Sequence, residues 1–316
     1  NPYAGLVSHL RAAWLSGKTR PMEYRVAQLE ALGRFLEEKK EDILEATASD
    51  MGKPSFEAYF TEILLCKNEL NDTLNNLSHW MKDEHVDKNL VTRLDSAFIR
   101  KDPYGVVLII APWNYPIHLL LVPLIGAIAA GNCVIVKPSE TSKNTERLLA
   151  EMLSCYLDNV RTSPCPCPCT RAMVFPTLHM PAPRHPQFRV CSTSFLHAQP
   201  RCPRSRGAGP TSPSPLPSQV VNQVLERTSS GGFCGNDTLM HVTLTSLPFG
   251  GIGNSGLGMY HGKFTFDTFT HHRGCLHRNM GLEALNALRY PPYSQQKLGL
   301  LSAAFQIKRR GMCTLL

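Results

Sequence analysis

The sequence predicts an α/β protein with a helical N-terminal region and an incomplete, Rossmann-type parallel sheet. Residues 105–111 and 133–136 are short apolar runs rich in β-branched residues, as buried parallel strands are. Each run is followed by a stretch of helical periodicity, at 116–130 and 144–157, so the order is strand, helix, strand, helix. Residues 161–217 break this pattern with a Pro-rich composition, and we expect this insert to be disordered.

The N-terminal region is predicted to be helical before the first strand. Residues 21–36 combine an initial proline with apolar side chains at helical spacing. Residues 41–49 continue as a second helix, which Gly52 is placed to end. A third apolar stripe, at 56–77, predicts a longer helix with one buried face.

The span 104–136 carries no charged side chain, so a transmembrane helix is an alternative to a buried strand-helix-strand unit. Three prolines lie within the span, and Gly131-Asn132 introduces a turn. These features favour the buried unit.

The positive charge of the chain comes almost entirely from one segment. Of the net charge of +8, residues 161–217 supply seven arginines and no acidic residue, together with 13 of the 24 prolines. No aromatic platform accompanies these arginines, so nucleic-acid binding is not expected.

The run TSPCPCPCTR, at 162–171, alternates cysteine with proline. A metal site is one alternative, but zinc sites use cysteine pairs at wider spacing with a second pair elsewhere. The composition favours a non-homologous insert that arises from altered splicing or reading frame. No metal site is predicted.

Order is predicted to return at residue 218. Residues 220–225 indicate a helix, and 241–247 alternate as a strand does. Residues 251–256 match G-x-G-x-x-G, but 259–266 are a poor start for the helix that a dinucleotide fingerprint needs. We therefore interpret these glycines as a loop with positive φ angles.

Polar residues directly follow both predicted strands, where open α/β sheets bind ligands. The side-chain amide of Asn114 can donate to a developing oxyanion, and the alternative is a turn residue between prolines. Lys137 and Glu140 can hold ribose hydroxyls, and the alternative is a solvated charge pair.

Together, these runs resemble the aldehyde dehydrogenase superfamily, and most closely the B-type members of its family 3. The resemblance covers about residues 1–160 and 218–316. It is carried by four runs, at 111–116, 131–140, 248–251 and 260–262. It implies a cofactor-binding domain, a catalytic domain and a small strand extension for homodimer formation.

The resemblance implies oxidation of medium- or long-chain aliphatic aldehydes to carboxylic acids with NAD or NADP. The family uses a cysteine nucleophile and a glutamate-activated water. By the resemblance, Asn114 stabilises the oxyanion, and Lys137 and Glu140 face the adenine ribose. The aldehyde pocket is implied to be lined or bordered by Tyr115, Phe249, Tyr260 and His261.

The two motifs that carry this chemistry are missing. The family places its G-Q-x-C nucleophile and its E-L-G-G base where residues 161–217 stand, and the sequence contains neither. Cys133 opens a buried strand, and Cys234 has no evident base, so neither is expected to replace the nucleophile. The chain is predicted to be inactive. Alternatives are a truncated isoform that dimerises with full-length subunits, or an error in the predicted gene sequence.

The C-terminal residues suggest a lipid anchor. Cys313-Thr-Leu-Leu316 fits a prenylation box, with leucine favouring geranylgeranyl. A basic cluster supplies a second membrane signal, at Lys308, Arg309 and Arg310. We expect a cytoplasmic protein that lies peripherally on the plasma membrane or on lipid-droplet or endoplasmic-reticulum surfaces. The predicted segments are residues 1–160, the insert 161–217, the C-terminal part 218–306 and the tail 307–316.

Overall fold

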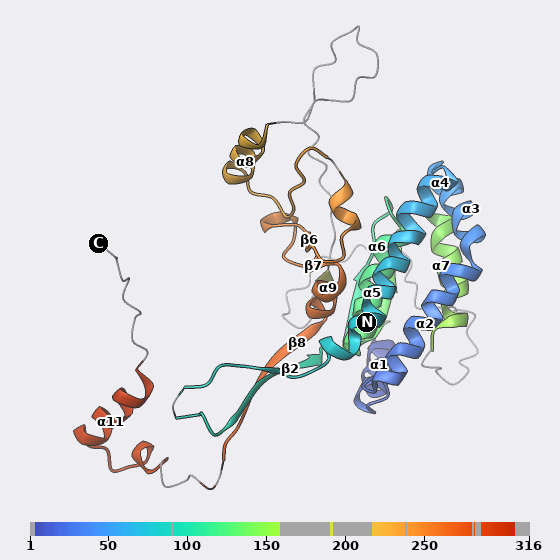
Figure 1. The fold of residues 1–316 in the computed structure, drawn as a ribbon. Helices are drawn as coiled ribbons and strands as arrows, with labels where there is room; N and C mark the ends of the chain where they lie inside the picture. Colours follow the sequence, from blue (N-terminus) through green and yellow to red (C-terminus); the bar gives the residue numbers. More distant parts are fainter. Residues whose placement is uncertain are drawn as a thin grey trace. The chain divides into compact units, whose positions relative to one another are not determined.

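The structure, a computed structural model, describes residues 4–89, 91–158, 190–191, 217–237, 239–279, 281 and 286–306 (Figure 1). The chain forms two units, and each is described by itself. The larger unit consists of residues 1–81 and 103–270, and the smaller of 82–102 and 271–316. Most of the Pro-rich segment and the whole tail from residue 307 lie outside the described residues, with the TSPCPCPCTR run, the prenylation box and the basic cluster.

The larger unit begins with the predicted helices. Gly52 ends the third of them in the left-handed conformation, with a φ of 65°. The stripe at 56–77 lies in one long helix, whose second part has a π-helical register. The helices are α1 (Ala4–Leu15), α2 (Met22–Glu38), α3 (Lys40–Met51), α4 (Ser55–Ala58), the π-helical η1 (Tyr59–Leu64) and α5 (Leu65–Trp80).

The predicted strand-helix-strand unit is confirmed. Its elements are β3 (Val106–Ile110), α6 (His118–Ala130), β4 (Cys133–Lys137) and α7 (Lys143–Tyr156). The strands β3 and β4 pair in parallel, with Val106 opposite Cys133. In the described part of the chain, no helix has the length and apolar composition to cross a membrane.

A third strand comes from the Pro-rich segment. Val190–Cys191 form β5, which pairs in parallel with β3 on the side away from β4. The order β4-β3-β5 leaves β4 at one edge of the described sheet.

Helix α6 forms the centre of the core. All of its residues except Ile128 are buried, and it packs against α5, α2 and α9 (Gly262–Thr268), as Figure 1 shows. A β-carbon on Gly126 would meet the Thr265 side chain at 2.2 Å, so this glycine permits the close approach of α6 and α9.

The C-terminal part of the larger unit is less regular. The predicted helix is present, but the strand predicted at 241–247 is wrong. The Asp237 carboxylate accepts hydrogen bonds from two backbone amides at the start of a 3₁₀ turn instead. The elements are α8 (Ser218–Arg227), the 3₁₀ turn η2 (Met240–Thr243), β6 (Phe249–Gly250), the 3₁₀ turn η3 (Gly253–Ser255), β7 (Met259–Tyr260) and α9.

The glycine run at 251–256 is a loop, as predicted. Gly253 and Gly256 have φ angles of 60° and 112°, which favour glycine. The expectation that 259–266 would start no helix is wrong, because α9 begins at Gly262. The Glu69 carboxylate accepts the backbone N–H of Gly262, and this distant residue supplies the cap that the local sequence lacks.

The smaller unit is built on a three-stranded sheet in the order β1-β2-β8. Its elements are β1 (Glu84–His85), β2 (Ser96–Pro103), β8 (Thr270–His277), the 3₁₀ turn η5 (Ala287–Arg289) and α11 (Gln295–Phe305), where Pro103 and Thr270 belong to the larger unit. Arg273 and Asp102 form an ion pair of 3.0 Å in this unit, and α11 has no buried residue.

Candidate functional site

The loops that follow β3 and β4 lie together. The Ser142 hydroxyl donates to the backbone oxygen of Trp113 at 3.3 Å and so joins the two loops. Asn114, in the loop after β3, is half-buried. Lys137 and Glu140 form an ion pair of 2.7 Å, and the Lys137 hydrogen bond lowers the pKa of Glu140. Among the described residues, Lys137 and Glu140 are therefore paired with each other.

A buried ion pair supports the first of these loops. The Lys53 ammonium lies 2.7 Å from a Glu62 carboxylate oxygen, and the two side chains are 8% and 0% exposed. Lys53 also lies 4.1 Å from the centre of the Tyr115 ring and donates to the backbone oxygen of Asn114 at 3.4 Å. The pair therefore contacts both residues that the sequence predicts for this loop.

Glu62 has a second role at the start of α6. Its other carboxylate oxygen accepts the backbone N–H groups of Ile117 at 3.2 Å and His118 at 2.9 Å. Burial raises the pKa of Glu62, and the charge and hydrogen bond of Lys53 oppose that rise. The π-helical register of η1 carries this side chain, and π-helical segments are frequent at functional sites.

The predicted pocket residues Phe249, Tyr260 and His261 come together in one aromatic cluster. The ring centres of Tyr260 and His261 are 4.6 Å apart, and that of Phe249 lies 5.3 Å from Tyr260. His118 stacks on His261 at 6.4 Å. Since His118 starts α6 just after the Tyr115 loop, it connects this loop to the cluster.

Glu69 holds the His261 side of the cluster in place through hydrogen bonds. One of its oxygens lies 3.3 Å from Nδ1 of His261, and the other accepts the N–H of Gly262 at 2.6 Å and the hydroxyl of Thr265 at 3.2 Å. His261 has a positive φ of 96°, which a non-glycine residue rarely adopts. These three contacts stabilise that conformation.

His118 is a neutral imidazole in this cluster. Burial, followed by the nearby His261 and Lys53, lowers its pKa to about 3. Its Nε2 and that of His261 have no hydrogen-bond partner among the described residues. Two buried, unpartnered nitrogens in one cluster are uncommon in a structural core.

Four residues of this arrangement were not predicted from the sequence: Lys53, Glu62, Glu69 and His118. One signal was available. Glu62 and Glu69 are spaced seven residues apart beside the apolar stripe of the predicted helix at 56–77, where a solvated carboxylate is unexpected. The histidine had no comparable signal.

Two of the described cysteines, Cys66 and Cys133, lack an activated thiol. Burial raises the pKa of Cys66 and of Cys133, which disfavours the reactive thiolate in both. Cys133 lies in a core cluster, as predicted. Cys234 is half-buried in the loop after α8.

The described residues fit only part of a dinucleotide. Lys137 and Glu140, at the end of β4, are the residues that the resemblance implies for the ribose. A helix N-terminus is the usual cradle for a pyrophosphate, but Glu62 already binds the first amides of α6 with a negative charge. The N-terminus of α6 therefore does not fit a pyrophosphate.

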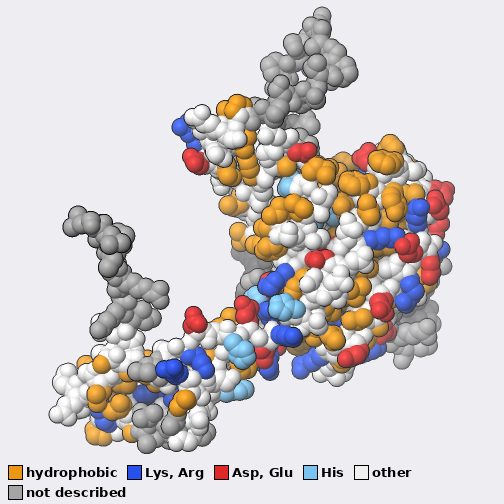
Figure 2. All heavy atoms as spheres, in the orientation of Figure 1, with side chains coloured by type: hydrophobic (Ala, Val, Ile, Leu, Met, Phe, Trp, Pro, Cys, Tyr) orange, Lys and Arg blue, Asp and Glu red, His pale blue; other side chains and the backbone are white. Residues whose placement is uncertain are grey.

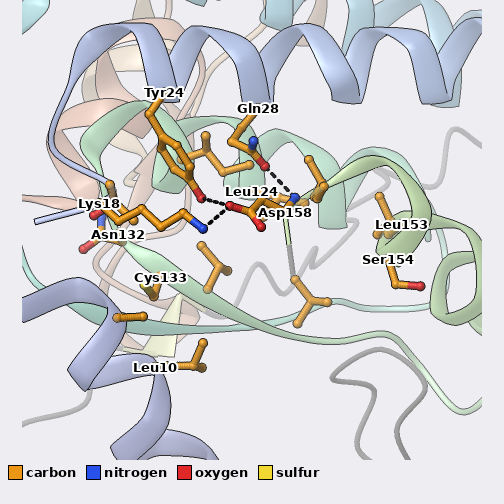
Figure 3. Close-up of a pocket in the computed structure, with 16 residues that line it drawn as sticks. Leu10, Lys18, Tyr24, Gln28, Leu124, Asn132, Cys133, Leu153, Ser154 and Asp158 are labelled. Carbon is orange, nitrogen blue, oxygen red and sulfur yellow. Dashed lines mark hydrogen bonds and ion pairs between the residues drawn. The ribbon is translucent and has the colours of Figure 1, made fainter. Parts of the chain in front are cut away.

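A cavity of 130 Å³ lies elsewhere, beside β4 and between α1, α2 and α7 (Figure 3). None of the residues predicted for catalysis, cofactor or substrate lines it.

The fold is that of an aldehyde dehydrogenase. The family described as the aldehyde dehydrogenase family matches residues 7–156. With the relatives below, this match shows that the chain belongs to the aldehyde dehydrogenase family.

Within that family, the chain is similar to B-type members of family 3. It is 38% identical to aldehyde dehydrogenase family 3 member B1 of Bos taurus, with 100% of both chains covered. It is 37% identical to family 3 member B2 of Mus musculus, with 100% of this chain and 97% of the relative covered. The substrate-bound Staphylococcus aureus AldH shares the fold, with a TM-score of 0.70 at 23% identity over 95% of this chain and 98% of that chain.

The alignment with the Bos taurus relative also shows how much of that protein has no counterpart in this chain. It is 468 positions long and includes all 316 residues of this chain, so at least 152 positions of the Bos taurus relative have no counterpart here.

Proposed function

We propose that this chain is a non-catalytic member of its family that associates with complete subunits. Members of the family oxidise aldehydes, and NAD or NADP is the cofactor that the resemblance implies. The observation that carries the proposal is the deficit of at least 152 aligned positions, together with the missing G-Q-x-C and E-L-G-G motifs. Without a cysteine thiolate there is no thiohemiacetal, and hence no species that can transfer a hydride.

The retained residues support binding rather than turnover. Lys53, paired with Glu62, contacts Asn114 and Tyr115. Glu69 contacts His261, which packs with Phe249 and Tyr260. They would border an aldehyde in a complete subunit. In this chain, burial disfavours the thiolates of Cys66 and Cys133.

The smaller unit is the surface that we assign to the contact between subunits. Its outer strand β8 exposes most of its side chains, and so does α11. Apolar side chains of this unit that are exposed include Leu94, Leu276, Tyr293, Leu298 and Leu300. An exposed apolar set on a small strand extension fits a homologous subunit as its partner.

The experiment has two readouts. The purified chain, given NAD or NADP with octanal or hexadecanal, is expected to produce no NADH or NADPH above the protein-free rate. Production that is abolished by Asn114→Ala would contradict the proposal. The same chain, co-expressed with a tagged family 3 member B1, is expected to co-purify with it.

A matched pair of variants tests the surface. Leu276→Asp is expected to abolish co-purification, because it places a charge on β8. Leu257→Asp is expected to leave it intact, because Leu257 is equally apolar but lies on the larger unit. Equal recovery of both variants would remove the smaller unit from the proposal.

Membrane attachment forms a further part of the proposal. The sequence at Cys313 supports geranylgeranylation, and Lys308, Arg309 and Arg310 support binding to anionic lipid. One lipid chain binds a membrane weakly, so both signals are required. Fractionation of the Cys313→Ser variant, which keeps the basic cluster, measures the contribution of the lipid.

A further inference from the structure

The cavity beside β4 reaches around the edge of the sheet (Figure 3). Cys133 packs with Leu10 of α1 on one face of β4, while Val134 and Val136 pack against the main core on the other face. All four side chains, with Leu153 of α7, line the same cavity. Since β3 occupies one edge of β4, a cavity that touches both faces lies along the other edge.

The backbone of β4 has unused hydrogen-bonding groups at this edge. Cys133 donates its N–H to Gly105 at 2.8 Å, and the Lys137 oxygen accepts from Ala111 at 2.9 Å, so odd-numbered residues face β3. Backbone groups alternate along a strand, so those of Val134 and Val136 point away from β3. Among the described residues, no strand pairs with β4 on that side.

The polar side chains at the rim of the groove already have partners. Figure 3 shows Lys18 and Tyr24 converging on Asp158. The Lys18 ammonium lies 2.5 Å from the carboxylate, and the Tyr24 hydroxyl donates to it at 3.2 Å. The Asp158 N–H donates to the Gln28 side chain at 2.7 Å. The side chains of the rim are therefore already paired with one another. The main-chain groups of β4 are then the polar groups that a ligand can recognise.

We propose that this groove binds an extended polypeptide segment of another protein, which adds to the sheet as a strand beside β4. Strand addition uses the edge N–H and C=O groups for affinity and the flanking pockets for side-chain selection. The walls are Leu10 and Ala13 on one face, and Leu153 and Leu157 on the other. The segment is therefore apolar on both faces, as a central parallel strand is.

Two observations favour a partner over other occupants. At least 152 positions of the Bos taurus relative have no counterpart in this chain, so protein that the relative carries is missing here. The edge of β4 lies between α1 and α7, so the same edge of a second copy, flanked by its own helices, cannot approach it. Burial also raises the pKa of the Cys133 thiol in the wall, which disfavours a covalent ligand. The inference holds whether or not the chain oxidises aldehydes.

Hydrogen exchange of the full chain gives the first test. In the free chain, the amides of Val134 and Val136 are expected to exchange at least about tenfold faster than that of Ile135, which faces β3. Addition of a capped synthetic peptide with five consecutive valines between two lysines is expected to slow both amides. If they are already as protected as Ile135, residues of this chain occupy the edge, and the proposal fails.

Variants of β4 give the second test, with the same fluorescently labelled peptide as the probe. Val136→Pro removes one outward N–H without touching the pairing with β3, and is expected to weaken binding at least about tenfold. Val136→Thr keeps that N–H and a similar shape, and is expected to bind within about threefold of the parent chain. Equal binding by the proline variant would overturn the proposal.

Three controls complete the design. A peptide with proline at its central position is expected to bind the unaltered chain at least about tenfold more weakly, which keeps the test decisive if Val136→Pro does not fold. Saturable binding of 1-decanol without any peptide binding would assign the cavity to a small apolar molecule. Protection of the two valine amides by self-association alone would assign it to a second copy. Either result overturns the proposal.

Discussion

Helices α6 and α8 both carry apolar side chains, but their environments are opposite. In α6, Ile125 is 0% exposed, and all residues but one are buried. In α8, no residue is buried, and Val220, Val224 and Leu225 are 40%, 43% and 52% exposed. Figure 2 shows hydrophobic side chains on the surface over α8.

The difference shows what a missing partner does to a helix. The stripe of α8 has the spacing that predicts a buried face, just as the run of α6 does. Helix α6 has α2, α5 and α9 around it, whereas α8 is left uncovered by the described residues. An amphipathic helix is stable mainly through tertiary packing, so we expect α8 to contribute little to the free energy of unfolding.

The largest effect is expected when a buried charge that contacts α6 is compared with an exposed charge in α8. Glu62→Ala is expected to lower the free energy of unfolding by about 3–5 kcal/mol, because it leaves Lys53 buried without its partner and two α6 amides unbound. Urea unfolding measures it. Glu226→Ala in the exposed α8 is expected to change the same quantity by less than about 0.5 kcal/mol.

The double variant Lys53→Met with Glu62→Leu serves as the control for that prediction. Replacement of both charges by apolar side chains is expected to recover most of the lost stability, since no buried charge remains. A single Glu62→Ala variant as stable as the parent chain would contradict the burial of this pair.

The second comparison uses matched apolar truncations. Ile125→Ala is expected to destabilise the chain by about 2–4 kcal/mol, since it leaves a cavity in the core. Val224→Ala is expected to stay within about 0.5 kcal/mol of the parent, because its side chain is exposed and alanine has higher helix propensity. Thermal unfolding of both variants checks this. Comparable losses would show that α8 is packed.

The third expected effect is a pH dependence of the free energy of unfolding, which arises from His118 at the start of α6. The folded pKa of His118 is about 3, below its ordinary value of 6.5, so the unfolded chain binds a proton that the folded chain does not. This contribution to stability is complete above pH 6.5 and is lost as the pH falls toward 3, by up to about 1.4 kcal/mol per pH unit. In His118→Leu, the slope of the free energy of unfolding against pH, between pH 6.5 and pH 4, is expected to decrease by the equivalent of one proton. An unchanged slope would mean that His118 is protonated in the folded chain.

Local periodicity made most of the elements predictable. The helices α2 and α3, the strands β3 and β4 and the helix between them all follow from apolar spacing and turn residues. The prediction failed at 241–247, where alternation was present but the described residues supply no neighbouring strand. Alternation indicates a strand only where another strand is available to pair.

The candidate site was only half predictable, for a related reason. Asn114, Lys137 and Glu140 follow strand ends, and strand ends can be located from the sequence. The residues that hold the site in place cannot be located from the sequence, because their partners are distant along the chain. Glu69 lies 193 residues from Gly262, and Glu62 lies 56 residues from His118.

The sequence by itself determined the family framework, the elements of the first half and the absence of both catalytic motifs. These depend on residue identity and on local spacing, which are both written in the chain. The tertiary structure alone decided that Lys53 and Glu62 are buried together, that α8 is uncovered and that β4 presents a free edge among the described residues. Burial depends on which other segments are present to exclude water, and no local pattern records that.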